Sequence, residues 1–143
     1  MVNDLTKLYI LIKRFEGCRL TPYLCPAGVW TCGWGSTGAG VFPGEPWTQE
    51  YADERMQRDA KRFALKTLIL CPNLKKEQLC AIADFAYNVG LNNFKNSTLR
   101  LKINANQSSE VGKELFKWVF AGGKKLNGLL RRRQAEYDLY ISG

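Results

Sequence analysis

Glu16 is the residue of the opening segment best suited to acid–base chemistry, because it is the sole acid between residues 5 and 44. It lies four residues after Ile12, on or beside the apolar stripe of a helix that the spacing predicts over residues 4–16. Burial beside that stripe and the partial negative charge at a helix C-terminus both favour a protonated carboxyl. Such a carboxyl can act as a general acid near neutral pH. The local pattern also allows a solvated last-turn residue or an ion pair with Arg19.

Cys25 and Thr31 follow Glu16 at nine and fifteen residues, in a segment rich in glycine, proline and aromatic residues. Residues 18–47 predict a small antiparallel sheet of short strands, with a tight turn at residues 26–28. A hairpin at this turn brings both side chains back toward the end of the first helix. By themselves the two residues are ordinary, since most free cysteines are small buried hydrophobes and threonine is a good strand former.

The composition excludes several kinds of chemistry. The 143 residues contain no histidine, which rules out Ser-His-Asp and Cys-His catalysis and every zinc site that needs imidazole. The five cysteines cannot all pair within one chain, and no Cys-x-x-Cys motif occurs, so reduced thiols are expected and a Cys71–Cys80 bridge stays open. We expect neither a metal nor a cofactor. The formal charge of +8 favours anionic partners.

The remaining elements that must position these groups are helical. Asp4 is expected to cap the first helix, and a last helix is expected over residues 127–140. Thr48 is the N-cap candidate of a helix that ends near Leu70, and Asn73 is that of a helix that ends at Gly90. Ser97 is the candidate for a shorter helix, and Ser108 or Ser109 is the candidate for a helix that runs through Val119. The pattern predicts an α+β fold in a single domain, residues 1–143, with the first helix and a small β lobe in residues 1–47, a larger helical lobe in residues 48–143 and a cleft between the lobes.

Several segments, in order and compactly spaced over nearly the whole chain, carry a family resemblance. They are RFEGCRL at 14–20 with Tyr23, GVWTCGWG at 28–35, DFAYNVG at 84–90, STL at 97–99, and the group Trp118, AGGK at 121–124, GL at 128–129, RR at 132–133 and Glu136. In these segments the chain resembles the phage-type lysozymes, glycoside hydrolase family 24, which are the muramidase endolysins of bacteriophages and prophages. A lysozyme-like fold is therefore expected.

The resemblance implies an activity and a catalytic set. The activity is cleavage of the β-1,4 bond between N-acetylmuramic acid and N-acetylglucosamine in peptidoglycan, which lyses the host cell. The family's catalytic set, a Glu, then an Asp or sometimes a Cys, then a Thr, falls on Glu16, Cys25 and Thr31. Glu16 would protonate the leaving oxygen, and the other two would position or activate a water on the opposite face of the sugar.

Two positions depart from the family pattern. Cys25 replaces the commoner Asp, and a free thiol with a pKa near ~8.5 is mostly uncharged at neutral pH. As a thiolate it could serve as base or nucleophile, so the stereochemical outcome stays open. Ser36 stands where many relatives have a histidine after the Gly-x-Gly element, so another group must support this hairpin.

Three consecutive arginines near the C-terminus bear on the catalytic acid. The resemblance implies that one arginine of this motif pairs with the catalytic Glu. Arg132 is favoured and Arg133 is the alternative, since neighbouring residues point to different sides of a helix. The aromatic residues just before this motif, Phe116, Trp118 and Phe120, are predicted to belong to the core.

Other functions remain open on the sequence. A lytic transglycosylase would act on the same bond, and an inactive wall-binding or nucleic-acid-binding domain would use the charge alone. The preferred interpretation is a monomer that binds peptidoglycan, with no nucleic-acid partner and no stable membrane insertion. The apolar run from Leu8 to Ile12 is too short for a membrane span. Synthesis in the host cytoplasm is expected, with access to the periplasmic wall after a holin-type partner permeabilises the membrane.

Overall fold

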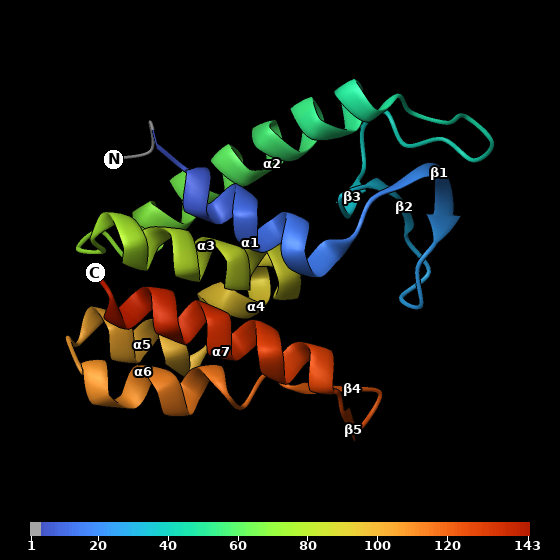
Figure 1. The fold of residues 1–143 in the computed structure, drawn as a ribbon. Helices are drawn as coiled ribbons and strands as arrows, with labels where there is room; N and C mark the ends of the chain where they lie inside the picture. The colour runs from blue at the N-terminus through green and yellow to red at the C-terminus, as the bar shows by residue number, and fades with distance from the viewer. Residues whose placement is uncertain (1–3) are drawn as a thin grey trace.

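Helix α3 (Lys76–Val89) lies at the centre of the helical lobe in the computed structural model, which describes residues 4–143. Residues 79 to 86 are all buried, because α3 is enclosed by α1 (Thr6–Glu16), α2 (Gln49–Leu70) and α7 (Asn127–Ile141), as Figure 1 shows. A helix enclosed in this way needs apolar residues all round. Asp84 is the one charged residue in this buried stretch. The first three residues of the expected domain lie outside the described range.

The β lobe is a three-stranded antiparallel sheet in the order β1 (Arg19–Leu24), β2 (Trp30–Gly33), β3 (Ser36–Thr37). Tyr23 pairs with Thr31, so the catalytic candidate Thr31 lies in the central strand. The turn between β1 and β2 closes with the Cys25 N–H donating to the Val29 carbonyl over 3.0 Å. Gly28 adopts a φ of +80°, which glycine tolerates without strain. The small sheet and its turn at residues 26–28 were both predicted from the sequence.

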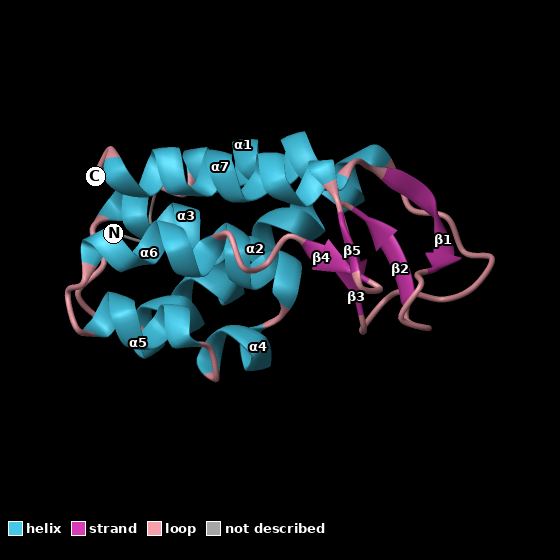
Figure 2. Ribbon diagram, turned by 90° about the horizontal axis from the view of Figure 1, so that it is seen from below, coloured by secondary structure: helices cyan, strands magenta, loops and turns pink. Residues whose placement is uncertain are grey.

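The long helix α2 begins beside the β lobe and ends in the helical lobe (Figure 1). The Thr48 hydroxyl accepts the Tyr51 N–H at its start over 3.1 Å, as predicted. Ser97 caps α5 (Thr98–Asn104) in the same way, through the Arg100 N–H. With α4 (Leu91–Lys95) and α6 (Ser108–Leu115), these helices complete the helical lobe seen in Figure 2.

Three predicted helix caps are wrong. Helix α6 begins at Ser108, with Gln107 at the cap position, so neither Ser108 nor Ser109 caps it. The first helix begins at Thr6 rather than at residue 4, with Leu5 at the cap position. Asp4 still accepts the Thr6 N–H over 3.3 Å, while its other carboxylate oxygen pairs with Lys76 at 2.7 Å. Helix α3 begins at Lys76 rather than beside Asn73. Its first turn is closed instead by Gln78, whose side-chain oxygen accepts the Lys75 N–H over 2.9 Å.

The segment after α6 also differs from its prediction. Helix α6 ends at Leu115, and the chain then forms a second hairpin, β4 (Phe120–Ala121) with β5 (Lys124–Lys125). The two glycines between these strands both have positive φ, which closes a two-residue turn. Phe120 is 59% exposed on this hairpin, so the prediction that it belongs to the core is wrong. The short helix α4 had no sequence prediction.

The architecture is the predicted α+β fold, with a small antiparallel sheet and a larger helical lobe (Figures 1 and 2). All five cysteines are free thiols, so the Cys71–Cys80 bridge that the sequence left open does not form in this structure. Within residues 4–143 no helix is long and apolar enough to cross a membrane.

Replacing Phe85 by alanine is expected to destabilise the protein by about 3–5 kcal/mol, the cost of a large cavity in a packed core. Phe85 is fully buried and packs edge-on against Phe94 and Trp118, with ring centroids 6.1 and 5.4 Å away. Urea unfolding measures the change. Phe120→Ala is the matched control and should change stability by less than about 0.5 kcal/mol, because that ring is exposed. Equal losses in the two variants would contradict the assignment of the core.

Candidate active site

Glu16 is the last residue of α1, and Gly17 ends the helix with a φ of +68°. Its side chain is 20% exposed, so it lies between the solvated and the fully buried environments. Oε2 accepts a hydrogen bond from Nη1 of Arg132 over 2.6 Å. Oε1 faces Gly35, where a Cβ atom would lie only 2.7 Å from it. Glycine at position 35 therefore lets the β lobe approach this carboxyl.

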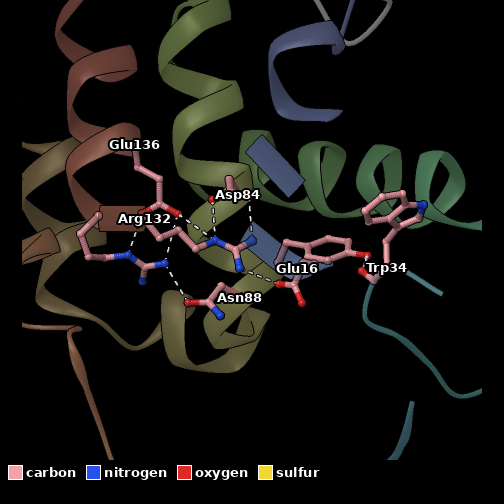
Figure 3. Close-up of polar contacts among 8 residues, drawn as sticks. Glu16, Trp34, Asp84, Asn88, Arg132 and Glu136 are labelled. Carbon is pink, nitrogen blue, oxygen red and sulfur yellow. Dashed lines mark hydrogen bonds and ion pairs between the residues drawn. The ribbon is translucent and has the colours of Figure 1, made fainter. Parts of the chain in front are cut away.

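Arg132 holds Glu16 from inside the helical lobe. The Nε and Nη2 groups of its guanidinium donate hydrogen bonds to Oδ2 and Oδ1 of Asp84, over 2.9 and 2.8 Å. This bidentate pair leaves Nη1 to donate to Glu16 (Figure 3). Arg133, the sequence alternative, points elsewhere: it bonds Glu136 and Asn88. Arg19, the other suggested partner, lies over the ring of Tyr23, 4.1 Å from its centroid. Consecutive residues point about 100° apart on a helix, which separates the two arginines.

Three carboxyl groups, of Glu16, Asp84 and Glu136, meet two guanidinium groups in this cluster. Burial alone would raise the pKa of Asp84, but hydrogen bonds with Glu136 and Arg132 outweigh it and hold this pKa below its ordinary value. Burial and the neighbouring Asp84 raise the pKa of Glu136 well above its ordinary value. Glu136 therefore takes the proton and Asp84 keeps the negative charge that binds Arg132.

The three residues singled out from the sequence line one cavity between the lobes. Its volume is about 530 Å³, and Glu16, Cys25 and Thr31 all belong to its walls. The other walls include Tyr23, Gly35, Ser36, Phe63, Tyr87 and Asn88. A carboxyl from the helical lobe thus faces a thiol and a hydroxyl from the β lobe across a space large enough for sugar rings.

Cys25 lies at the end of β1, where the turn surrounds its sulfur with hydrogen-bond donors. A hydrogen bond from the backbone of Val29 lowers the pKa of the Cys25 thiol, with further help from Ala27 and the Thr31 hydroxyl. Slight burial opposes this effect without overcoming it. A lowered pKa increases the thiolate fraction at a given pH, which is the form that acts as base or nucleophile.

Sequence reasoning missed the residues that support the hairpin in place of the absent histidine. The Ser36 hydroxyl donates to Oδ2 of Asp59 over 2.7 Å, and Arg55 donates to Oδ1 of the same carboxylate over 3.2 Å. Arg55 also donates to the carbonyls of Thr37 and Ala39. An i,i+4 pair on a predicted helix was the available signal, but it does not reveal that both groups are buried under the hairpin.

A second contact joins the lobes at Trp34. The Tyr87 hydroxyl donates to the Trp34 carbonyl over 2.7 Å, and the indole N–H donates to Asp53 over 2.7 Å. Burial, reinforced by the charge of Glu16, raises the pKa of Tyr87, so this donor keeps its proton. The β2–β3 turn is therefore bonded to α2 and α3 on either side of Gly35.

Within residues 4–143, no group of acids and cysteines is placed to hold a metal ion.

The fold is that of the lysozyme-like muramidases. The structure is similar to the muramidase domain of SpmX from Asticaccaulis excentricus, with a TM-score of 0.87 and 27% identity over 96% of this chain and 97% of that one. It is also similar to the active form of the P1 phage endolysin Lyz, with a TM-score of 0.83 and 26% identity over 99% of this chain and 87% of that one.

The sequence comparisons assign the family. The phage lysozyme family model matches residues 13–136, so the chain belongs to the phage lysozyme family. An endolysin of Acyrthosiphon pisum secondary endosymbiont phage 1 is 40% identical, over 93% of this chain and 94% of its own length. The chain is thus a glycoside hydrolase of the lysozyme type, which confirms the resemblance and the enzyme class predicted from the sequence.

Replacing Glu136 by glutamine should flatten the pH dependence of stability. A group whose pKa is raised on folding stabilises the folded state at any pH below its pKa in the unfolded chain, which is about 4.3 for glutamate. That contribution disappears as the pH rises through its pKa in the folded protein. The unfolding free energy of the unmodified protein should therefore fall more between pH 4.5 and 8 than that of Glu136→Gln, since glutamine cannot ionise. Urea unfolding across this range measures the difference.

Glu45→Gln is the matched control for this experiment, because Glu45 is exposed in a loop. It should follow the pH profile of the unmodified protein. If Glu136→Gln follows the same profile too, then the carboxyl of Glu136 is not protonated in the folded state and the charge assignment is wrong.

Proposed function

We propose that Glu16, Cys25 and Thr31 hydrolyse the β-1,4 bond between N-acetylmuramic acid and N-acetylglucosamine in bacterial peptidoglycan. The single observation that carries this proposal is that all three side chains line one cavity, from opposite lobes. Glycosidases need an acid on one side of the scissile bond and a base or nucleophile on the other. The geometry offers that pairing, with positive charge developing on the sugar between the groups.

Glu16 is the proposed acid, and Arg132 is its positioning residue. Arg132 holds Oε2, while Oε1 lies at the Gly35 side of the cavity, where it can reach the leaving oxygen. Because the guanidinium is itself fixed by Asp84, the carboxyl has little freedom to turn away. Orientation of this kind lowers the entropic cost of proton transfer to the glycosidic oxygen.

Cys25 and Thr31 act on the opposite face of the sugar. As a thiolate, Cys25 accepts a proton from a water that adds to the anomeric carbon as the bond to the leaving oxygen breaks. Thr31 positions that water, and its hydroxyl is itself oriented by a 3.0 Å hydrogen bond to the Val29 carbonyl. The backbone groups that lower the thiol pKa make the thiolate more accessible near neutral pH.

The biological setting follows from the same proposal. The net charge of +8 suits a wall rich in carboxylate and phosphate groups. Residues 1–143 would work as one catalytic domain and as a monomer, made in the host cytoplasm and admitted to the periplasmic wall by a holin-type permeabiliser. Cell fractionation with and without that partner tests the route, and wall digestion without it would contradict the proposal. Anhydromuramic ends in the digest would identify a lytic transglycosylase instead.

Glu16→Gln should reduce lysis of outer-membrane-permeabilised cells at least about a hundredfold, since a general acid contributes about 10²–10⁴ in rate. Turbidity clearing measures the rate, and circular dichroism checks that the fold is retained. Glu54→Gln, an exposed glutamate on α2, is the control and should keep full activity. Undiminished lysis by Glu16→Gln would reject Glu16 as the acid.

Substitutions at Cys25 separate a chemical role of the thiol from simple water positioning. Cys25→Ser should lose at least about tenfold in rate, because serine does not ionise near neutral pH, whereas Cys25→Asp should retain activity as a carboxylate base. The activity of the unmodified enzyme should rise with pH as the thiolate forms, and this rise should be absent in Cys25→Asp.

Cys18→Ser is the matched control, because Cys18 is also a partly buried thiol of the β lobe. It packs against the apolar cluster that contains Cys32 and Trp47 and does not line the cleft. It should leave the rate and its pH dependence unchanged. Full activity of Cys25→Ser would show that the thiol has no chemical role.

A further inference from the structure

A second hollow lies next to the catalytic cavity, beside the β lobe. This second hollow has a volume of about 580 Å³ and shares Thr37, Asp59 and Arg62 with the catalytic cavity. Its remaining walls are Gly38, Ala39, Gly40, Tyr51, Arg55 and Arg58. We call it the arginine groove. Because the two spaces share walls, one polymer strand can occupy both at once.

The arginine groove carries uncompensated positive charge. Asp59, its one acid, is already engaged by the Ser36 hydroxyl at 2.7 Å and by Arg55 at 3.2 Å. Arg62 approaches the same carboxylate only to 3.6 Å and is half exposed. Arg58 is exposed, and its contact is with the neutral hydroxyl of Tyr51 at 3.4 Å. Arg58 has no ion pair with a carboxylate among the described residues, and Arg62 shares the single charge of Asp59 with Arg55, so the groove carries an excess of positive charge.

The rest of the groove is formed by a loop of small residues, 37–40, and by Tyr51, none of which carries a charge. Gly38 and Gly40 both have positive φ, and a Cβ at position 40 would lie 3.2 Å from the Tyr51 hydroxyl. The loop is held against α2 by Arg55, which bonds the carbonyls of Thr37 and Ala39. A preformed wall with an excess of positive charge suits an anion.

We propose that the arginine groove binds a carboxylate of the peptide carried by muramic acid, on the strand whose glycosidic bond lies in the catalytic cavity. This inference rests on the proposed function, because the shared walls make the groove ligand part of the substrate. The glycan hydroxyls and acetamido groups are neutral, so the attached peptide supplies the anion. Planar guanidinium groups pair with carboxylates through two parallel hydrogen bonds. The enzyme thereby distinguishes peptide-bearing from bare strands.

Two charge-matched double variants test the inference. Arg58→Gln/Arg62→Gln removes the groove charges, and Lys61→Gln/Lys66→Gln removes two exposed charges of the same helix that line neither cavity. kcat/KM is measured on peptidoglycan strands and on strands stripped of peptide by an amidase, whose muramic acids keep only the lactyl carboxylate next to the sugar ring. The groove variant should lose about five- to twentyfold on peptide-bearing strands, mostly in KM, and at most about twofold on stripped strands, as expected for two partly exposed ion pairs. The lysine variant should keep the unmodified ratio between the two substrates.

Arg58→Gln alone provides a check on folding, because Arg58 has no contact with the Ser36–Asp59–Arg55 network that anchors the hairpin. It should show the same substrate-dependent loss in a smaller amount, with unchanged thermal unfolding. An equal loss on both substrates would show that the arginines attract the wall non-specifically, and no loss on either would show that the groove is unused. Either result overturns the proposal.

A binding measurement separates failure of this inference from failure of the proposed function. Disaccharide-tetrapeptide and the same disaccharide without peptide are titrated into the unmodified protein and into Arg58→Gln, with NMR as the readout. Tighter binding of the peptide form that is lost in Arg58→Gln supports the groove even if no strand is cleaved. Equal affinities overturn it even if strands are cleaved. The kinetic comparison is repeated on walls stripped of phosphate polymers, and disappearance of the variant's loss there would assign the groove to phosphate and reject the carboxylate.

Discussion

The guanidinium of Arg132, buried between two carboxylates, is the interaction on which the site depends. One side of it forms a bidentate pair with Asp84 in the centre of α3, and the remaining nitrogen holds Glu16 at the end of α1 (Figure 3). Burial of one charged residue among apolar neighbours is costly unless it is paired. Arg132 supplies that pairing for Asp84, and Asp84 in turn fixes the direction in which Arg132 presents its last donor. The catalytic carboxyl is thus oriented from the core rather than from the surface.

Asp84 and Glu136 lie next to each other in this buried cluster. Two neighbouring carboxyl groups that are both buried do not both ionise readily, so one of them keeps its proton. Burial and Asp84 place that proton on Glu136 by raising its pKa. Protonated Glu136 can then donate a hydrogen bond to Asp84 and accept one from Arg133. The hydrogen bonds around Arg132 hold its guanidinium and the Glu16 carboxyl in place, which is what the positioning of a catalytic group requires.

The second requirement is that the β lobe be held close to this carboxyl. Gly35 allows the approach because any side chain there would strike Glu16. The hairpin is anchored on one side by Tyr87 and on the other by the Ser36–Asp59–Arg55 network. Cys25 and Thr31 are carried into the same cavity by the register of β1 with β2. The arrangement needs no histidine, because the hydroxyl of Ser36 finds a partner on α2 that also binds the following loop.

Local signals in the sequence determined the order and type of the main elements. The apolar stripe of α1, the capping hydroxyls of Thr48 and Ser97, and the turn around Gly28 depend on residues close together in the chain, and each was predictable. The early acid, thiol and hydroxyl could be singled out by type and spacing, and the family resemblance gave them roles to test. The caps at Asp4 and Asn73 were mistaken because these helices begin later, after Leu5 and after Lys75, where Gln78 closes the first turn of α3.

Only the tertiary structure decided which arginine meets Glu16, which carboxyl carries the proton and what supports the hairpin. Glu16 and Arg132 are 116 residues apart in sequence, Asp84 and Arg132 are 48 apart, and Ser36 and Asp59 are 23 apart. No local pattern specifies such contacts, because they arise from how whole helices pack. The same packing sets the burial that decides protonation. Interactions between residues close together in the chain therefore determine the secondary-structure elements. The burial of charged groups between those elements determines the chemistry of the site.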